Sequence, residues 1–313
     1  MRIVFMGTPD FAVPTLEALH QKGHDIICVV TQPDRPKGRG QKLAFSPVKE
    51  ISIKLGLDVE QPEKVKDKGF VDKLRAWAPD VIAVVAFGQL LSQEILDIPK
   101  YGCINLHASL LPKYRGAAPI HYAILHGEKV TGNTTMLMDI GMDTGDMLLT
   151  NQIDITDDDT TGSIHDKLAA SGGALMLETL EHIGDIVPRK QDENMATYAS
   201  KIDREMELIN WDAAAEDIHN KIRAFNPWPV AYTLLAGSRI KLFASRLAKD
   251  ITAENFKPGQ FAGETDEGFL IAAKDCALEI LSLQPESRKR ISAKDYIKGY
   301  NQNKDDMIFG SNY

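Results

Sequence analysis

The stretch Val81–Phe87 reads VIAVVAF, an unbroken apolar run without a polar face. A strand of this kind is buried on both sides, which is typical of a parallel sheet covered by helices on its two faces. Arg2–Met6 (RIVFM) and Asp25–Thr31 (DIICVVT) are further runs of this type, and Phe11–Lys22 between them has the spacing of an amphipathic helix. The pattern predicts an α/β domain at the start of the chain.

Further along, Cys103–His107 and Thr134–Met138 are strand candidates, and Ser163–His182 has the apolar spacing of a helix. From Arg189 to Glu207 the residues become polar, which indicates a linker. With 313 residues the chain is longer than one ordinary core. We therefore expect two domains.

The region after the linker has a different pattern. It opens with a predicted helix at Ala213–Phe225, and short β-rich segments separated by turn signals follow. Several short strands of this kind indicate a small barrel. The segments are Ala231–Leu235, Ile240–Ala244, Phe269–Ala273 and Ala277–Leu283.

The composition, with 43% hydrophobic and 26% charged residues, is that of a globular chain and excludes a disordered or collagenous one. No apolar run approaches the ~20 residues of a membrane span, and Met1–Gly7 is too short for a signal peptide. Cys28, Cys103 and Cys276 form no C-x-x-C pair and are expected to be buried thiols in a reducing compartment. We therefore expect a cytoplasmic protein.

The net charge of −8 argues against a protein that coats nucleic acid indiscriminately. The excess of acidic residues lies within residues 1–208, whereas acids and bases are equal in number from 209 onward. This asymmetry permits a polyanion to meet the C-terminal part.

The turn Gly7–Phe11 (GTPDF) follows a strand and opens a helix, the place where parallel α/β proteins bind phosphates. It lacks the G-x-G-x-x-G spacing, and Pro9 removes one backbone amide. A tight turn is the better interpretation. A nicotinamide-dependent dehydrogenase is discarded on this ground.

Asn105 and His107 fall on the same face of a predicted strand, because side chains alternate along a strand. An amide donor beside an imidazole can activate a carbonyl group: the amide stabilises a developing oxyanion and the imidazole handles a proton. A structural histidine is an equally good interpretation of these two residues alone.

Asp143 lies in a turn with two nearby glycines, which allow the chain to fold back sharply. A carboxylate that arrives beside His107 would orient the imidazole and favour its charged form. The alternative is an Asx-type turn in which the aspartate caps the backbone. The residues by themselves slightly favour the turn.

A metal site built from Cys103, His107, His121 and His126 is a further alternative. Their spacings match no structural zinc pattern. No metal is expected.

Residues 33–43 (PDRPKGRGQKL) form a basic cluster with a net charge of +3. Its prolines and glycines predict a projecting loop without regular structure. On an acidic protein, contact with a phosphate backbone is the natural use of such a loop. Its cations are Arg35, Lys37, Arg39 and Lys42.

With these motifs in view, the chain resembles the bacterial methionyl-tRNA formyltransferases nearly end to end. The Asn/His/Asp set with the SLLP segment is shared by enzymes that take formyl groups from 10-formyltetrahydrofolate. The basic loop and the segment at 223–229 narrow the resemblance to the tRNA-directed enzymes. The matching segments are Gly7–Ala12, Thr31–Pro36, Gly38–Gly40, Ser46–Lys49, Asn105–Pro112, Arg115–Ile120, Asp143–Met147 and Arg223–Pro229.

The resemblance implies an α/β, Rossmann-like parallel-sheet formyltransferase domain over residues 1–188. A linker at 189–208 and an OB-like β-barrel that helps to hold tRNA at 209–313 would follow. The implied reaction moves the formyl group of 10-formyltetrahydrofolate to the α-amine of methionine on initiator tRNA, with no metal. A monomer is expected.

The resemblance also implies roles for the candidate residues, and it reverses the preference for a capping Asp143. Asn105 and protonated His107 would stabilise the oxyanion, while Asp143 would tune His107 and relay protons. Ser109, Leu110, Leu111 and Pro112 would line the folate site. Arg35, Lys37, Arg39 and Lys42 would meet tRNA, with Arg39 reaching the acceptor end.

Two other functions stay open at this point. One is a formyl transfer to glycinamide ribonucleotide or an amino sugar, or hydrolysis of the donor. These relatives share the Asn/His/Asp set but have no reason for the basic loop. The other is a tRNA-binding protein without activity, which predicts loss of Asn105, His107 or Asp143, yet all three are present.

Overall fold

The computed structural model describes residues 1–37, 42–300 and 303–310. The chain divides into two compact units whose segments interleave along the sequence. Unit 1 comprises Met1–Pro119, Val130–Asp154 and His165–Ala199, and unit 2 comprises Ile120–Lys129, Ile155–Ile164 and Ser200–Tyr313. The boundaries inferred from the sequence, 1–188, 189–208 and 209–313, stay a prediction.

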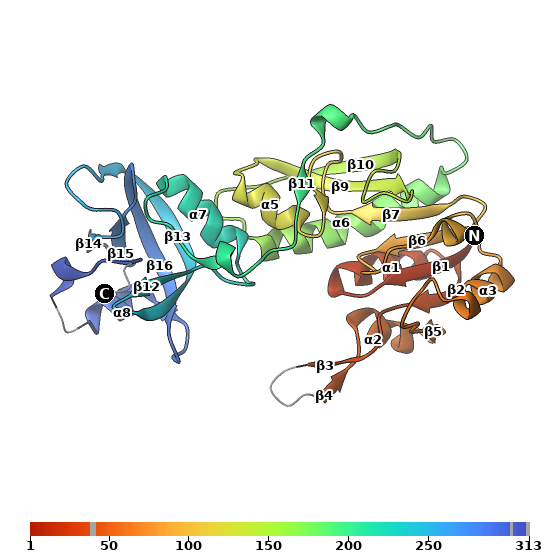
Figure 1. The fold of residues 1–313 in the computed structure, drawn as a ribbon, viewed down its shortest axis with the longest axis horizontal. Helices are drawn as coiled ribbons and strands as arrows, with labels where there is room; N and C mark the ends of the chain where they lie inside the picture. The colour runs from red at the N-terminus through yellow and green to blue at the C-terminus, as the bar shows by residue number, and fades with distance from the viewer. Residues whose placement is uncertain (38–41, 301–302, 311–313) are drawn as a thin grey trace. The chain divides into compact units, whose positions relative to one another are not determined.

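Unit 1 is built on a seven-stranded sheet with the order β10-β9-β7-β6-β1-β2-β5 (Figure 1). The run from β5 to β7 is parallel, as the apolar segments predict, whereas β9 pairs antiparallel with β7 and β10 antiparallel with β9. The sheet is therefore mixed, with β7 at the junction of its two parts. The strands are β1 (Arg2–Gly7), β2 (Asp25–Val30), β5 (Val59–Glu60), β6 (Val81–Val85), β7 (Cys103–His107), β9 (Val130–Leu137) and β10 (Met147–Asp154).

Helices lie against this sheet. On one face, Val84 and Cys103 belong to a buried apolar cluster that includes Phe70 of α3 and Ile95 of α4. On the other face, α6 approaches β7 so closely that a Cβ on Gly172 would come within 2.6 Å of Leu106 Cδ2. The helices are α1 (Val13–Gln21, preceded by a 3₁₀ turn at Asp10–Ala12), α2 (Pro47–Lys54), α3 (Lys68–Trp77), α4 (Gln93–Leu96) and α6 (Thr161–Glu181).

The basic segment departs from the prediction of an irregular loop. Two short strands, β3 (Arg35–Lys37) and β4 (Lys42–Ala44), pair antiparallel, with Pro36 opposite Leu43. A proline cannot donate to a ladder but is tolerated in an edge strand, and both strands of an isolated pair are edges. Residues 38–41 between them lie outside the described residues.

The segment predicted as a linker is partly docked on unit 1. Arg189 and Met147 exchange two backbone hydrogen bonds, and further on β11 (Tyr198–Ala199) pairs in parallel with β8 (Arg115–Gly116). We call residues 189–199 the strap. The polar composition of the strap reflects a chain that is held by hydrogen bonds to the domain surface.

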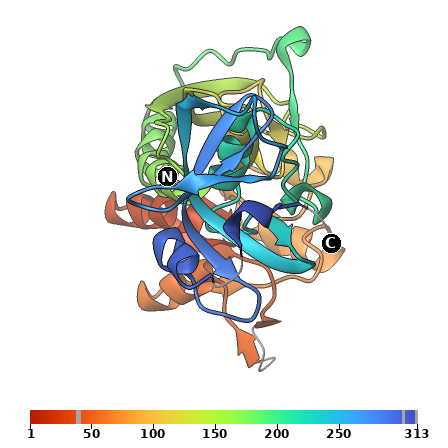
Figure 2. The ribbon, with the colours of Figure 1, turned by 90° about the vertical axis from the view of Figure 1, so that its left-hand side faces the viewer.

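Unit 2 contains an antiparallel sheet with the order β12-β13-β16-β15-β14, and β17 pairs with β16. Its strands are drawn in teal to blue in Figure 2. Residues near the end of the chain connect its two edges, because Phe309 bridges Leu235 at the end of β12, and Ile308 bridges Gln260 just before β14. This closure agrees with the predicted small barrel. The strands are β12 (Tyr232–Leu235), β13 (Ser238–Thr252), β14 (Phe261–Glu264), β15 (Phe269–Ala272), β16 (Cys276–Pro285) and β17 (Ile291–Ser292).

The helices α7 (Ala215–Ala224) and α8 (Ala293–Lys298) pack against this sheet, and most of α5 (Pro119–Leu125) also belongs to unit 2. Buried Arg223 of α7 donates to the backbone carbonyls of Thr156 and Asp159. These contacts attach the 155–164 segment to the C-terminal part of the chain within unit 2.

The cysteines are free thiols. Cys28 and Cys103 are buried, and desolvation raises the pKa of each thiol to about 12. Cys276 is only half-buried, against the expectation. Within residues 1–37, 42–300 and 303–310, no helix combines the length and the apolar character that crossing a membrane requires.

Candidate active site

The candidate site begins on β7, where Asn105 and His107 share one face of the sheet. Both are largely buried, with 9% and 6% of their surface exposed. Asn105 lies between Val84 of β6 and Met136 of β9 in the register of the sheet. Because strands on both sides fix the backbone, the two polar side chains leave the sheet in a set direction.

The loop that joins β9 to β10 brings Asp143 to His107. The Asp143 Oδ2 atom lies 3.7 Å from His107 Nδ1 and accepts a hydrogen bond of 2.8 Å from the Gly116 amide. The His107 Nε2 atom lies 2.9 Å from the Tyr114 carbonyl oxygen. A carbonyl oxygen only accepts, so Nε2 carries a proton, and Nδ1 is the nitrogen that faces the carboxylate.

The separation of 3.7 Å is an ion-pair distance when the imidazole is charged, and it is too long for a hydrogen bond. When Nδ1 is protonated, its N–H can therefore donate a hydrogen bond to a third group. The Asp143 carboxylate is therefore placed to balance the charge of a protonated imidazole.

The Asn105 side-chain amide makes no hydrogen bond within the described part of the chain. Its polar atoms are not among the buried side-chain atoms without a partner, so they reach the surface, where they can donate or accept a hydrogen bond. Asn105 thus offers a donor beside His107 that a bound group can use.

The SLLP segment is fixed next to this pair by Thr134 of β9. The Thr134 hydroxyl donates to the Ser109 carbonyl and accepts from the Leu111 amide, at 2.7 and 3.1 Å. Ser109 and Leu111 are buried, and Leu110 and Pro112 are partly exposed. Of the four residues predicted for the folate site, Leu110 and Pro112 therefore have more surface available to a ligand.

Two further loops carry exposed apolar side chains. Ile140 and Met142 precede Asp143 in its loop and are 70% and 59% exposed, and Leu90, after β6, is 76% exposed. These side chains give the loops that follow β6 and β9 an apolar surface.

Sequence reasoning missed three residues that meet behind Asp143. Arg115 donates to the Gln191 side chain and to the Glu193 carboxylate, and Gln191 donates to the Asp143 carbonyl. Arg115 stands in a matching motif, yet nothing in that motif reveals its partners. Gln191 lies in a polar stretch without periodicity, so no local signal separates it from its neighbours.

The predicted tRNA-contacting residues fall on the β3–β4 hairpin or between its strands. Arg35 is exposed on β3. Lys37 ends β3 and Lys42 begins β4, but their side chains lie outside what the structure describes, as does Arg39 as a whole. Among the described residues, Arg35 makes no hydrogen bond or ion pair with Asn105, His107 or Asp143.

The root of the hairpin is held by a polar network. Lys49 of α2 donates to the Asp34 carboxylate and to Gln61, at 2.5 and 2.7 Å. Gln61 in turn donates to Asp34 and to the Gln32 carbonyl. The hydrogen bond from Lys49, and then that from Gln61, lower the pKa of Asp34.

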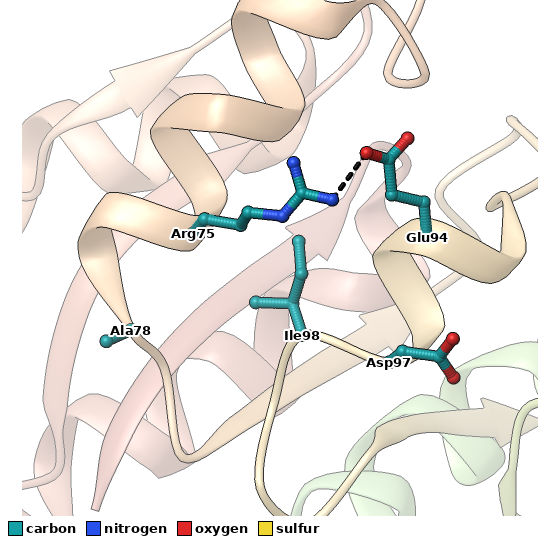
Figure 3. Close-up of a pocket in the computed structure, with 5 residues that line it drawn as sticks. All are labelled: Arg75, Ala78, Glu94, Asp97 and Ile98. Carbon is teal, nitrogen blue, oxygen red and sulfur yellow. Dashed lines mark hydrogen bonds and ion pairs between the residues drawn. The ribbon is translucent and has the colours of Figure 1, made fainter.

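A pocket between α3 and α4 contains none of the predicted residues. It is lined by Ala78, Asp97 and Ile98 and by the ion pair of Arg75 with Glu94 (Figure 3). In the described ranges of the chain, no three His, Cys, Asp or Glu side chains are grouped so that they could hold a metal ion. Cys103, His107, His121 and His126 therefore do not form the metal cluster that was considered as an alternative.

Comparison with known proteins identifies the family. The family model described as formyl transferase matches residues 1–180, and the one described as formyl transferase, C-terminal domain, matches residues 201–301. The chain is 52% identical over 312 residues to the methionyl-tRNA formyltransferase of Clostridium botulinum, covering 98% of this chain and 99% of the relative. The chain belongs to the methionyl-tRNA formyltransferase family.

Other comparisons agree. The methionyl-tRNA formyltransferase of Bacillus subtilis is 48% identical over 311 residues, covering 98% of this chain and 97% of the relative. Among solved structures, the sugar 3N-formyltransferase WlaRD is 22% identical, with a TM-score of 0.68 over 92% of this chain and 99% of that one. HypX from Aquifex aeolicus, solved with tetrahydrofolic acid, is 18% identical with a TM-score of 0.61, and the aligned region covers 95% of this chain and 47% of HypX. These two likenesses show the fold that methionyl-tRNA formyltransferases share with other proteins.

Proposed function

We propose that this chain transfers the formyl group of 10-formyltetrahydrofolate to the α-amine of methionine on initiator tRNA. The product, formylmethionyl-tRNA, begins translation. The observation that carries the proposal is the convergence of Asn105, His107 and Asp143 in a member of the methionyl-tRNA formyltransferase family. A cytoplasmic location and a monomeric state, both expected from the sequence, belong to the proposal.

The polar cluster is suited to the charge that develops during the transfer. When the amine attacks the formyl carbon, negative charge builds on the formyl oxygen, and donors fixed in advance stabilise it. The unpartnered Asn105 amide and the Nδ1–H of His107 are the two donors, and Asp143 balances the positive charge of the imidazolium. The Asp143 carboxylate also takes up the proton that the amine loses, and this proton passes to N10 of the folate as the bond between N10 and the formyl carbon breaks.

The same surroundings fit the folate co-substrate, which supplies the activated formyl group. Leu90, Ile140 and Met142 present apolar surface for a flat ring system, and Asn105 supplies an amide for polar recognition. Leu110 and Pro112 lie on the segment that Thr134 holds beside β7. These residues bind and orient the donor.

The acceptor is a large polyanion and needs cations beyond this pocket. Arg35, Lys37, Arg39 and Lys42 on the hairpin segment are proposed to contact tRNA phosphates, with Arg39 at the acceptor end. Barrel residues of unit 2, whose sequence lacks the acidic excess of the N-terminal part, are proposed to extend this contact. The hairpin root at Asp34 and Lys49 gives the cations a fixed base.

The acceptor can be tested directly. Purified protein with 10-formyltetrahydrofolate is offered methionyl-tRNA, free methionine and glycinamide ribonucleotide in parallel, and formylated product is measured. We expect product from methionyl-tRNA at a rate far above that from the other two. Preferential formylation of glycinamide ribonucleotide, or release of formate without an acceptor, would assign the site to another folate reaction.

A further inference from the structure

Asp143 has a left-handed backbone conformation. Its φ of +55° lies in a region that is unfavourable for most residues other than glycine, although aspartate tolerates it better than most. The loop also ends tightly, because a Cβ on Gly145 would fall 1.7 Å from the Leu137 carbonyl oxygen. Contacts from outside the loop must therefore keep Asp143 in place.

Gln191 of the strap supplies such contacts. Its Nε2 atom donates to the carbonyl oxygens of Asp143 and Gly145, both at 2.8 Å, and so spans the part of the loop that carries the carboxylate. Its Oε1 atom accepts from Arg115 Nε at 3.0 Å. Because a guanidinium only donates, Arg115 fixes which end of the Gln191 amide faces the loop.

Arg115 is itself immobilised. It is 1% exposed, and its two terminal nitrogens donate to the two carboxylate oxygens of Glu193 at 3.0 and 2.8 Å. This is the bidentate geometry that makes arginine–carboxylate pairs rigid. Glu193 lies two residues after Gln191, so the strap binds all three nitrogens of the guanidinium group.

The residues on either side of Arg115 contact His107 and Asp143. The Tyr114 carbonyl contacts His107, and the Gly116 amide binds the Asp143 carboxylate. The strap passes so near that a Cβ on Gly116 would lie 2.6 Å from the Ala199 carbonyl oxygen. Three consecutive residues thus connect His107, Gln191 and Asp143 into one array.

We infer that Gln191 is a positioning residue for formyl transfer: it sets the place of the Asp143 carboxylate relative to His107 and is itself oriented by Arg115. This inference rests on the proposed function, since it assigns Gln191 a part in the reaction of the same site. A displacement of about 1 Å in a reacting group can cost about 10²-fold in rate, so loss of the two hydrogen bonds is expected to slow turnover.

The test is the substitution Gln191→Glu in the full chain. Glutamate keeps the size of the side chain and the contact with Arg115, but it has no hydrogens for the Asp143 and Gly145 carbonyls. We expect kcat to fall by about 10-fold to 10²-fold with KM for both substrates little changed. Gln152→Glu, the same change at an exposed position of β10, is the matched control and should leave kcat unchanged.

A double-mutant cycle with Asp143→Asn separates positioning from a general structural role. If Gln191 acts through the Asp143 carboxylate, adding Gln191→Glu to Asp143→Asn costs less than about 2-fold further, whereas independent effects multiply. Multiplied losses, an undiminished kcat, or a rise in KM alone would overturn the inference. Where Gln191→Glu does not fold, as judged by its thermal unfolding, Gln191→Met removes the same donors and takes its place in the cycle.

The wild-type chain in the same assay separates the two claims. An inactive wild type, on methionyl-tRNA with 10-formyltetrahydrofolate, defeats the proposed function and the inference with it. An active wild type combined with multiplied losses in the cycle defeats the inference alone.

Discussion

The cluster on β7 and the β3–β4 hairpin differ in how the chain holds them. Asn105 and His107 are buried and fixed by neighbouring strands, whereas Arg35 is exposed and its hairpin is anchored at the root by Asp34 and Lys49. Stabilising a transition state requires groups fixed in advance inside a partly dry site, where electrostatic interactions are strong. Binding a polyanion requires exposed cations, which act through counterion release. The difference predicts that the two regions control separate kinetic constants.

The largest effect is expected for His107→Ala. Loss of a proton-handling and oxyanion-stabilising group should lower kcat by about 10²-fold to 10⁴-fold, with folate binding little changed. Steady-state formylation and a folate titration measure the two quantities. His182→Ala, at an exposed histidine near the end of α6, is the control. Turnover within a few-fold of wild type would remove His107 from the mechanism.

Asp143→Asn comes next, because it keeps the shape of the loop but removes the charge that balances the imidazolium. We expect kcat to fall by about 10²-fold. Asp146→Asn makes the same change in the same loop and should have little effect, since only its backbone carbonyl has a role in the turn. Equal rates for the two variants would show that Asp143 only caps the turn and takes no part in the reaction.

On the hairpin, Arg35→Ala should raise KM for methionyl-tRNA and leave kcat nearly unchanged. If Arg35 neutralises one phosphate, the slope of log affinity against log salt should shrink by roughly 0.7–0.9. Salt-dependent tRNA binding measures the slope. Lys54→Ala removes an exposed cation from the neighbouring α2 and is the comparison variant. An identical slope in Arg35→Ala and wild type would exclude Arg35 from the phosphate contacts.

The smallest effect concerns the stability of unit 2. Burial lowers the pKa of His219 below its ordinary value of 6.5, and its ring nitrogens contact Ser245 Oγ and the Asp157 carbonyl oxygen. The unfolded chain binds the proton more readily, so the stabilisation is complete above about pH 6.5 and is lost as the pH falls toward the folded-state pKa. Urea unfolding between pH 7.5 and 5.5 should show a steeper loss for wild type than for His219→Gln. Parallel curves would contradict this linkage.

Much of the framework was predictable because it follows from local patterns. The apolar runs of β1 and β6 identify a sheet buried on both faces, and alternation along β7 places Asn105 beside His107. The antiparallel edge formed by β9 and β10 was not predictable, because an apolar run does not encode the direction of its neighbour. The hairpin was missed because Pro36 argues against a strand everywhere except at an edge.

The residues that hold the Asp143 loop in place could not be predicted from local sequence patterns, for a different reason. Asp143 reaches His107 only because Gln191 and Gly116 hold its loop, and these contacts span 48 and 27 residues of sequence. Gln191 lies in a polar stretch whose composition resembles a flexible linker. Its role depends on where the strap docks, which the composition of the strap does not determine.

The most direct test of the separation between the two regions is a side-by-side measurement of kcat and KM for methionyl-tRNA in His107→Ala and Arg35→Ala. A crossed result is predicted: His107→Ala loses kcat at an unchanged KM, and Arg35→Ala raises KM at an unchanged kcat. A fall of kcat in both variants, or a rise of KM in both, would contradict the account, because it would show that chemistry and tRNA binding are not divided between the buried cluster and the exposed hairpin.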